Sequence, residues 1–293
     1  MCTLAGSRKL VIAKLANTSR EIYALKIYTK SANQKYNLKD KNMDSNKNAK
    51  AIWERKAQTF PRFLSEASDT IEIMRFFREN GADFRGKSTI DIGCGNGRFT
   101  FQLAKEAKSV LAVDISQKML ENLEADAKTL GLSNITTIQS AWEDFSANKK
   151  FDIALASLTP ALNNEDGFIK AFELFSEYFC YVGWGRVRRC TFMDEILKEH
   201  GVKLELPVGL PNVLSWLEKM GAKNVKHFYM KQDFTHKFNT KDEVAECIEW
   251  NIEAHSAVVD KQKVRDFVDK NAKGGKVTYM SEREVGLARI PRY

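Results

Sequence analysis

Three alternating glycines form the most chemically specific pattern in the sequence. Gly93, Gly95 and Gly97 follow directly on the short apolar segment 89–92, and a helical pattern opens after them at Phe99. A strand, a glycine turn and a helix N-terminus in this order make a cradle for a nucleotide. Glycine lets the backbone turn sharply and approach a ligand closely, which a Cβ atom would prevent.

The residues around the glycines indicate which nucleotide the cradle suits. A dinucleotide fingerprint spaces its glycines G-x-G-x-x-G, whereas here Arg98 stands where the third of these glycines would fall. Asp91, two residues before Gly93, would also repel a pyrophosphate, by about 4 kcal/mol for one charge pair at about 4 Å and an effective dielectric constant of about 20. The same carboxylate suits a ligand that carries an ammonium and a sulfonium group.

A second acidic residue, Asp114, follows the next apolar segment, 109–113. Its distance from Gly97 is close to the spacing at which an α/β nucleotide site places its ribose-binding carboxylate. A carboxylate there accepts hydrogen bonds from both ribose hydroxyls. Asp114 is also suited to the start of the helix predicted after Ser116, and the two roles are compatible.

The stretch 91–97, Asp-Ile-Gly-Cys-Gly-Asn-Gly, resembles motif I of the class I S-adenosylmethionine-dependent methyltransferases. The resemblance spans roughly residues 53–289, with specific motifs only in 91–114. It implies an α/β fold with a Rossmann-like, seven-stranded, mostly parallel sheet, helices on both faces and the last strand antiparallel. The activity that it implies is methyl transfer from S-adenosyl-L-methionine to a nucleophile.

The resemblance also implies a set of cofactor-binding residues, which lie in the glycine loop and after the next strands. In the family, the turn after the third strand usually carries an Asp for the adenine amino group, but that position here is Ala141. We expect the backbone of Trp142 and the nearby Glu143 to compensate, although Trp142 equally suits a core position. The predicted cofactor-binding residues are Asp91, Gly93, Cys94, Gly95, Asn96, Gly97, Asp114, Ile115, Trp142, Glu143 and Ser157.

Residues on the acceptor side are predicted from two segments and one strand end. Segment 51–60 reads as an amphipathic helix that ends near Pro61 and looks like the N-terminal helix that many small-molecule methyltransferases place over the cofactor. Segment 157–160 lacks the N/D-P-P-Y/F signature of amino-methylating nucleic-acid enzymes. The candidates for acceptor binding are Trp53, Lys56, Phe60, Thr159, Pro160 and Trp184, although the aromatic residues also suit simple packing and Thr-Pro a turn. No residue stands out as a general base, so the catalytic residues stay unknown.

The net charge of +8 is located entirely in the N-terminal segment. Residues 1–50 hold 11 of the 46 Lys and Arg residues and 3 of the 38 Asp and Glu residues, so residues 51–293 hold 35 of each sign. Phosphate binding needs a surplus of basic side chains on the folded domain. The distribution therefore argues against a nucleic-acid partner.

The cysteines and histidines indicate the compartment and argue against a metal site. Five scattered cysteines without a C-x-x-C pair favour reduced thiols and a cytoplasmic protein, and four histidines show no ligand spacing. No apolar run approaches the roughly 18 residues that a membrane span needs. The sequence does not fix the oligomeric state.

Residues 1–49 differ from the rest of the chain in being basic, polar and without periodicity. Three interpretations stay open: a targeting peptide, a disordered tail, or translated sequence upstream of a true start at Met43. Residues 50–293 are predicted to form the methyltransferase domain, with capping N-terminal helices at 50–80 and a helical insertion at 240–273. Within it we also expect a helix at 166–178 and strands at 179–184, 225–231, 277–281 and 285–290.

The function predicted from the sequence is S-adenosylmethionine-dependent methylation of a small-molecule acceptor. A tRNA or protein methyltransferase is the main alternative and would use the basic N-terminal segment as a recruiting arm. A non-catalytic cofactor-binding regulatory protein and an aminopropyltransferase are further alternatives, the last without an acidic polyamine-binding signature in the sequence.

Overall fold

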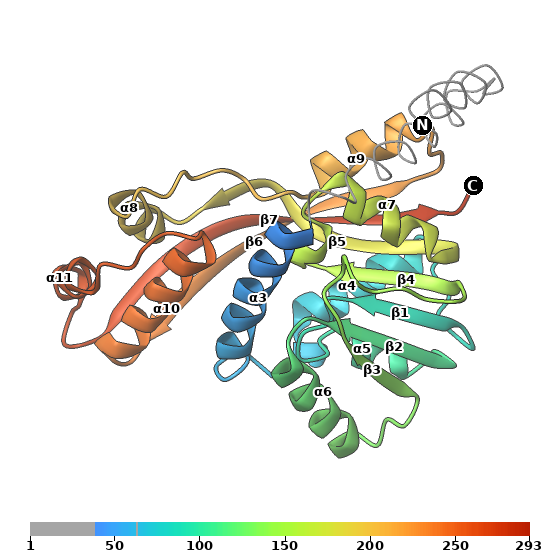
Figure 1. The fold of residues 1–293 in the computed structure, drawn as a ribbon, viewed down its shortest axis with the longest axis horizontal. Coiled ribbons are helices and arrows are strands. Elements are labelled where there is room, and N and C mark those ends of the chain that lie inside the picture. Colours follow the sequence, from blue (N-terminus) through green and yellow to red (C-terminus); the bar gives the residue numbers. More distant parts are fainter. Residues whose placement is uncertain (1–38, 63) are drawn as a thin grey trace, which may run out of the picture.

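The computed structural model describes residues 39–62 and 64–293, which build one seven-stranded sheet with helices packed around it (Figure 1). The strand order across the sheet is β3-β2-β1-β4-β5-β7-β6. The strands are β1 Ser88–Ile92, β2 Ser109–Asp114, β3 Ile135–Gln139, β4 Phe151–Ser157, β5 Phe175–Arg189, β6 Lys226–Phe238 and β7 Val277–Pro291.

Strands β1 to β5 run parallel to one another, and β7 is antiparallel to both of its neighbours. The predicted Rossmann-like sheet with a reversed last strand is thereby confirmed. The strand order reverses between β1 and β4, and ligands of such sheets bind beyond the carboxyl ends of the strands at this point. Asp91, Asp114 and Ser157 all lie at or near these ends.

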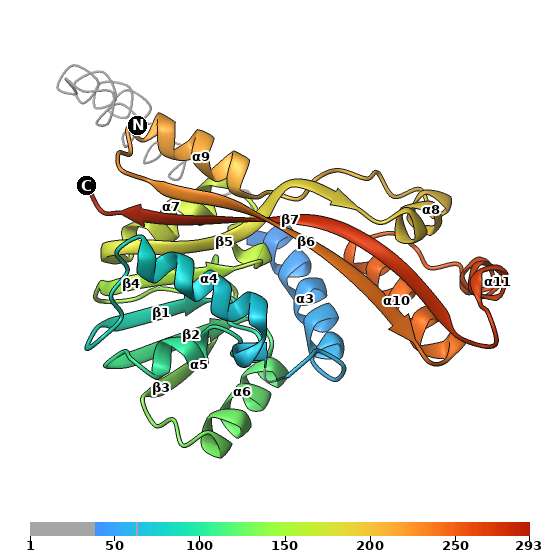
Figure 2. The same cartoon turned by 180° about the vertical axis from the view of Figure 1, so that it is seen from behind.

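Helices cover both faces of the sheet (Figures 1 and 2). In β4, Ile153 and Leu155 pack toward one face, while Ala154 and Ala156 pack toward the other, as the alternation of a strand requires. Because both faces are covered, the strand reads as an unbroken apolar run. The first face carries α4 Ser68–Glu79, α5 Thr100–Ala104 and α6 Gln117–Thr129, and the second carries α7 Glu165–Glu173, α9 Leu210–Lys219 and the short helix η2 Pro160–Leu162.

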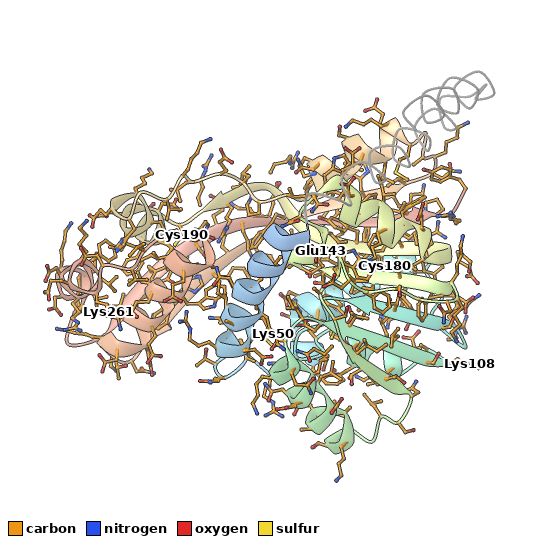
Figure 3. The ribbon with its side chains drawn as sticks, in the orientation of Figure 1. Lys50, Lys108, Glu143, Cys180, Cys190 and Lys261 are labelled. Carbon is orange, nitrogen blue, oxygen red and sulfur yellow. The ribbon has the colours of Figure 1, made fainter. Side chains whose placement is uncertain are left out.

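The outer parts of β5, β6 and β7 extend well beyond the other strands and carry a separate group of helices (Figure 1). We call this part the arm (residues 185–203 and 232–284). Its helices are α8 Thr191–Glu199, α10 Lys241–Ala254 and α11 Lys261–Asn271, and they enclose a small core of their own. Cys190 and Lys261 lie out on the arm, whereas Cys180 lies in the sheet and Lys108 lies just before β2 (Figure 3).

The two helices of the predicted insertion at 240–273 are present, but the strands that support them are longer than predicted. Strand β6 continues to Phe238 and β7 is one strand rather than two. The helix predicted for 166–178 is wrong beyond Glu173, because β5 already begins at Phe175, which pairs with Phe151 of β4. Here the packing of aromatic side chains against the sheet overrides local helix preference.

Helix α3 (Lys39–Lys56) bridges the sheet and the arm (Figure 2). The helix begins at Lys39 rather than at Ala51 and ends at Lys56 rather than near Pro61, so residues 39–49 belong to it. Residues 1–38, which include most of the predicted N-terminal segment, lie outside the described residues. In α3, Arg55 forms an ion pair with Glu253 of α10. The carboxylate of Glu54, also in α3, accepts hydrogen bonds from the backbone N–H groups of Gln117 and Lys118 at the start of α6. The short helix η1 (Leu64–Glu66) then leads into α4.

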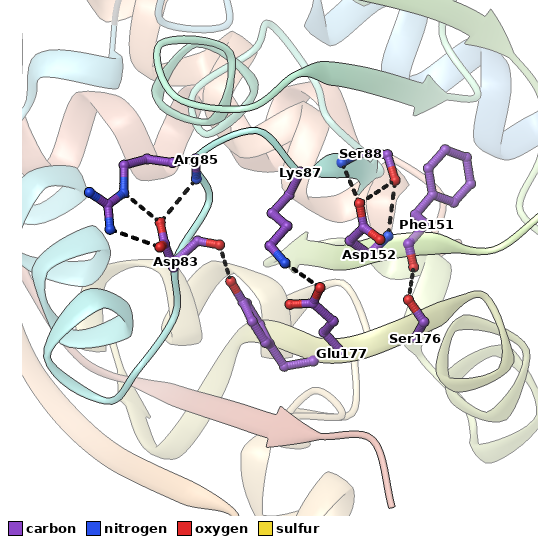
Figure 4. A network of polar contacts seen from close by, with 9 residues as sticks. Asp83, Arg85, Lys87, Ser88, Phe151, Asp152, Ser176 and Glu177 are labelled. Atoms are coloured by element: carbon purple, nitrogen blue, oxygen red, sulfur yellow. Dashed lines mark hydrogen bonds and ion pairs between the residues drawn. The ribbon is translucent and has the colours of Figure 1, made fainter.

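A polar network closes the amino-terminal edge of the sheet, opposite the predicted site (Figure 4). The carboxylate of Asp152 accepts hydrogen bonds of 2.8 Å from both the backbone N–H and the hydroxyl of Ser88, and these bonds lower the pKa of Asp152. Lys87 forms an ion pair with Glu177, and the Tyr178 hydroxyl donates to the backbone oxygen of Asp83. The network ties the amino ends of β1, β4 and β5 together.

The aromatic core under α7 allows a direct test of this packing. Phe168 is fully buried and its ring lies 5.6–6.5 Å from those of Phe172, Phe179, Tyr181 and Trp216. We expect Phe168→Ala to lower the free energy of unfolding by about 3–5 kcal/mol in chemical denaturation. Phe228, which is 51% exposed, is the control, and Phe228→Ala should cost about 1 kcal/mol or less. Equal costs for the two variants would contradict the described core.

Candidate functional site

A cavity of about 300 Å³ lies beyond the carboxyl ends of β1, β2 and β4. It is walled by the glycine loop after β1, the ends of these strands, the turn after β3 and the segment that follows α3. The predicted cofactor-binding residues that line it are Asp91, Gly93, Cys94, Gly95, Asn96, Asp114, Ile115, Trp142, Glu143 and Ser157. Among the predicted acceptor-binding residues, Trp53, Phe60, Thr159 and Pro160 line it.

The glycine loop is held by hydrogen bonds that leave one face open. The backbone N–H groups of Gly93 and Cys94 both donate to the Val113 carbonyl, at 2.8 and 3.1 Å. Gly93 has a φ of +66°, and a Cβ atom there would collide with Thr159. Gly95 has a φ of +53°, and a Cβ atom there would meet no protein atom within 4 Å. Because Gly95 lines the cavity, this empty space belongs to the site.

Asp114 supports the loop and faces the cavity at the same time. Its Oδ2 accepts a 2.9 Å hydrogen bond from the N–H of Gly95, and its Oδ1 accepts one of 2.9 Å from the N–H of Ser116. Each oxygen keeps a second acceptor position, so the carboxylate also has capacity for ligand hydroxyls. Burial raises the pKa of Asp114. The helix cap of α6 is supplied by Ser116, whose hydroxyl accepts from the N–H of Met119.

Asp91 is the second carboxylate of the cavity and is 2% exposed. Its Oδ2 accepts a 2.6 Å hydrogen bond from the hydroxyl of Thr100. Burial, aided by the negative charge of Asp114, raises the pKa of Asp91 to about 7, and the Thr100 bond opposes this rise. Neither Asp91 nor Asp114 forms an ion pair with Lys or Arg within the described ranges. The cavity therefore holds two carboxylates that a cationic ligand would stabilise.

The second half of α3 and the segment after it form one wall of the cavity, through Ala49, Trp53, Phe60 and Pro61. Asn96 donates its side-chain amide to the carbonyl of Phe60 at 3.2 Å, and Asn122 of α6 donates to the carbonyl of Ala57 at 3.1 Å. The rings of Trp53 and Phe60 meet edge to face, with centroids 6.5 Å apart. Two side-chain amides thus fasten this segment to the glycine loop and to α6.

Trp142 serves both the core and the cavity. It is 4% exposed, stacks on Phe145, and donates its indole N–H to the carbonyl of Gly167. Lys170 donates to the carbonyls of Trp142 and Glu143, at 2.5 and 2.9 Å, and burial lowers the pKa of Lys170. This lysine fixes the turn whose backbone was expected to replace the missing Asp.

Three predicted site residues lie outside the cavity lining. Gly97 faces α5 and α6, where a Cβ atom would crowd Phe101. Lys56 points to the arm, with its ammonium group 4.5 Å from the ring centre of Trp250. Trp184 lies under the guanidinium group of Arg188, at 4.8 Å.

The sequence reasoning also missed several lining residues. Arg98 lines the cavity. In the sequence it stands out only because it occupies the position of the third glycine of a dinucleotide fingerprint. Leu158 has a φ of 47°, which is uncommon outside glycine and occurs often at functional sites. No sequence signal marks such a backbone conformation. The other missed lining residues are Ala49, Pro61, Ile92, Phe99, Val113, Met119, Ser140, Ala161 and Asn163.

The part of the chain that the structure describes shows neither a metal centre nor a membrane-spanning helix. No group of three or more His, Cys, Asp or Glu side chains there is arranged to hold a metal ion. None of the helices described is both long and apolar enough to span a membrane.

The comparisons with known proteins agree with this geometry. The methyltransferase-domain family matches residues 83–282, which is more than half of the chain. The chain belongs to the S-adenosylmethionine-dependent methyltransferases. The family of tRNA (uracil-5-)-methyltransferases also matches, over residues 6–158. Among solved structures, a candidate methyltransferase from Bacillus halodurans shares the fold with a TM-score of 0.50 and 14% identity, and the match covers 75% of this chain and 98% of that one.

Three curated relatives are similar to parts of the methyltransferase. An uncharacterized protein of Haemophilus influenzae is 24% identical, over 63% of this chain and 68% of its own. A tRNA/tmRNA (uracil-C(5))-methyltransferase of Psychromonas ingrahamii is 30% identical over 31% of this chain and 22% of its own. A histidine protein methyltransferase 1 homolog of Dictyostelium discoideum is 26% identical over 51% of this chain and 54% of its own. The matches thus span 68% of the first relative, 54% of the third and under a quarter of the second.

The residues of the cavity fit S-adenosylmethionine. The cofactor carries an ammonium and a sulfonium group, and the cavity offers the buried carboxylates of Asp91 and Asp114. The open space in front of Gly95 gives a ligand close access to the backbone. Asp114 would hold the ribose hydroxyls and Asp91 the cationic methionine portion, while Ile115 and Trp142 would flank the adenine.

The raised pKa of Asp91 predicts how the stability of the cofactor-free protein depends on pH. The pKa is about 7 in the folded state and 3.8 in the reference state, so the folded protein favours the protonated form. Stability is therefore lost as the pH rises from about 4 to about 7, by up to about 4 kcal/mol at 1.36 kcal/mol per pKa unit. Asp91→Asn keeps an acceptor for Thr100 and removes this loss.

Denaturant titrations of the wild type and of Asp91→Asn at several pH values test this. The variant should gain stability relative to the wild type as the pH rises from 4 to about 7. A difference that stays constant over this range would contradict a raised pKa at Asp91.

Because the space beside Gly95 is empty, a side chain added at this position should weaken cofactor binding without disturbing the rest of the protein. Gly95→Ala places a methyl group in the cavity without touching other protein atoms, so we expect at least a tenfold loss of S-adenosylmethionine affinity in calorimetry. Gly86→Ala is the matched control, because Gly86 also has a positive φ and open surroundings but lies before β1, at the opposite edge of the sheet. Both variants should lose about 1–2 kcal/mol of stability through backbone strain. Equal cofactor affinities in the two variants would refute the placement.

Proposed function

We propose that this methyltransferase transfers the methyl group of S-adenosylmethionine to a small-molecule acceptor. The observation that supports this most is the position of residues 53–61 across the cavity. Trp53, Phe60 and Pro61 line it from above, and the amides of Asn96 and Asn122 hold the segment in place. An acceptor has to reach the methyl group beside this segment, in a cavity of about 300 Å³, which favours a small molecule over a folded macromolecule.

The distribution of charge supports the same proposal. Residues 51–293 carry equal numbers of acidic and basic side chains. Nucleic-acid binding depends on basic side chains that replace the counterions of the phosphates. The folded domain has no overall surplus of them.

The chemistry of the cavity favours an acceptor that is itself a nucleophile. S-adenosylmethionine supplies an activated methyl group, so the chain has to align the acceptor with it and exclude water. Cys94 lines the cavity, but burial raises its pKa well above the ordinary value and disfavours a nucleophilic thiolate. Ser157, Thr159 and Pro160 lie on the wall formed by the end of β4 and would position the acceptor.

A tRNA or protein acceptor is the second candidate. It is favoured by the match to the tRNA (uracil-5-)-methyltransferase family over residues 6–158 and by the partial similarity to a histidine protein methyltransferase. The first 50 residues hold the whole charge surplus of the chain and would serve as the contact with an acidic partner.

A labelling experiment separates the candidates. Full-length protein is incubated with methyl-labelled S-adenosylmethionine and cell extract, and the products are separated by size. We expect the label in a low-mass fraction, and pretreatment of the extract with ribonuclease or protease should leave the labelling unchanged. Gly95→Ala, which is expected to bind the cofactor poorly, serves as the control for background labelling.

Two outcomes would move the assignment to the second candidate. One is label in RNA or protein that is lost on the matching enzyme treatment. The other is binding of tRNA by the full chain with an affinity that falls steeply with salt, with a slope of about −0.7 to −0.9 per phosphate contact.

A further inference from the structure

Two arginines face each other where the arm leaves the sheet. Arg188 of β5 and Arg283 of β7 are direct partners in the antiparallel pair, and Gln232 of β6 is the partner of Arg283 on its other side. Directly paired residues project from the same face of a sheet, and like charges in such pairs are destabilising. The fold therefore brings two positive charges together at a cost.

A chain of polar contacts connects this pair to the cofactor cavity. Arg283 donates from Nε to Oε1 of Gln232 at 3.1 Å, and Gln232 donates to Oδ2 of Asp69 at 3.4 Å. The same carboxylate oxygen lies 2.7 Å from Nη2 of Arg98, which lines the cavity. The arginine pair is thus separated from the cavity wall by two side chains.

The positive charge of this region is only partly neutralised. Arg188 and Arg283 form no ion pair with any carboxylate among residues 39–62 and 64–293, and Asp69 is the acidic group that balances Arg98. Burial, and after it the charge of Arg98, lowers the pKa of Arg283 to about 10. Asp69 opposes this shift and Arg188 adds to it.

Aromatic rings hold both guanidinium groups in place. Arg188 lies 4.8 Å above the ring of Trp184, and Arg283 lies 4.1 Å from the ring of Phe234 and 5.8 Å from that of Trp184. Such contacts favour the cation without supplying a counter-charge. The N–H groups of a guanidinium that is stacked in this way keep their capacity for an oxyanion.

The neighbouring arginines of the same strand behave differently. Arg186 is paired with Glu284 through two hydrogen bonds of 2.9 and 2.8 Å, and Arg189 stands opposite Glu282. Glu282 itself forms an ion pair with Lys231. Arg186 thus has a carboxylate partner and Arg189 stands opposite a carboxylate, whereas Arg188 and Arg283 stand opposite each other.

We propose that Arg188 and Arg283 bind an oxyanion, a carboxylate or a phosphate, carried by the methyl acceptor. This inference rests on the proposed function and adds the class of acceptor, an anionic small molecule. A guanidinium group matches both oxyanions with a pair of parallel N–H donors. Neither arginine lines the cavity, so an acceptor held there by its anion would have to reach past Arg98 to the methyl group.

The test measures anion binding to the full chain saturated with S-adenosylhomocysteine. Inorganic phosphate and sodium succinate are titrated by calorimetry, each against sodium chloride of equal ionic strength, and the tighter of the two identifies the oxyanion. We expect Arg188→Gln and Arg283→Gln to weaken its binding at least tenfold and to leave the affinity for the cofactor unchanged. Arg186→Gln removes an arginine of the same strand and should bind the anion as the wild type does.

Three results would overturn the inference: a wild type that binds neither anion, Gln variants that bind as tightly as the wild type, or an equal loss in Arg186→Gln. Selective loss of single-stranded RNA binding in the two variants, with anion binding intact, would also overturn it. Because Arg188 is exposed, its variant keeps the test valid if Arg283→Gln does not fold. Failure of anion binding with small-molecule labelling intact refutes only this inference, whereas absence of that labelling refutes the proposed function.

Discussion

The site depends on two buried carboxylates at the ends of neighbouring parallel strands. Asp91 and Asp114 face one cavity without a cationic partner among the described residues, and burial raises the pKa of both. Isolated buried charges are costly, so ionisation of these two carboxyl groups destabilises the folded protein when the cofactor is absent. A cationic group of the cofactor beside Asp91 would relieve that cost. Asp114 also anchors the glycine loop, because it accepts a hydrogen bond from the N–H of Gly95.

The long antiparallel strands give the domain its second feature. The parallel strands β1, β2 and β4 end at the cavity, but β5, β6 and β7 continue past it and carry the arm. Helix α3 then joins the arm to α6 through Arg55 and Glu54, so it crosses the region between the two. The cavity wall is therefore built from residues far apart in the chain, such as Trp53, Arg98 and Thr159. The carboxyl ends of the strands form the cavity, and α3 connects its wall to the arm.

The residues of the site that lie close together in the sequence could be predicted from it. The residues that meet only because two strands pair in a particular register could not. The glycine loop and the spacing to Asp114 are contained within a single strand–turn–helix–strand unit, so their pattern sufficed. The opposition of Arg188 and Arg283 depends on an irregularity between Trp184 and Arg188 that shifts the pairing, and no composition signal marks it. Lys56 was predicted to face the acceptor, yet it lies over Trp250 because α3 packs against α10. Such long-range packing leaves no periodic trace in the sequence.

The number of protons released when S-adenosylmethionine binds tests whether a cationic group of the cofactor lies beside Asp91. Calorimetry at pH 7 in buffers of different ionisation enthalpy gives this number. If a cation binds beside Asp91, whose pKa is about 7, the carboxyl group must lose its proton, and the release should vanish at pH 8.5 and in Asp91→Asn. Net release at pH 7 that disappears under both conditions is the predicted result. Binding at pH 7 without proton release, or with uptake, would contradict the account.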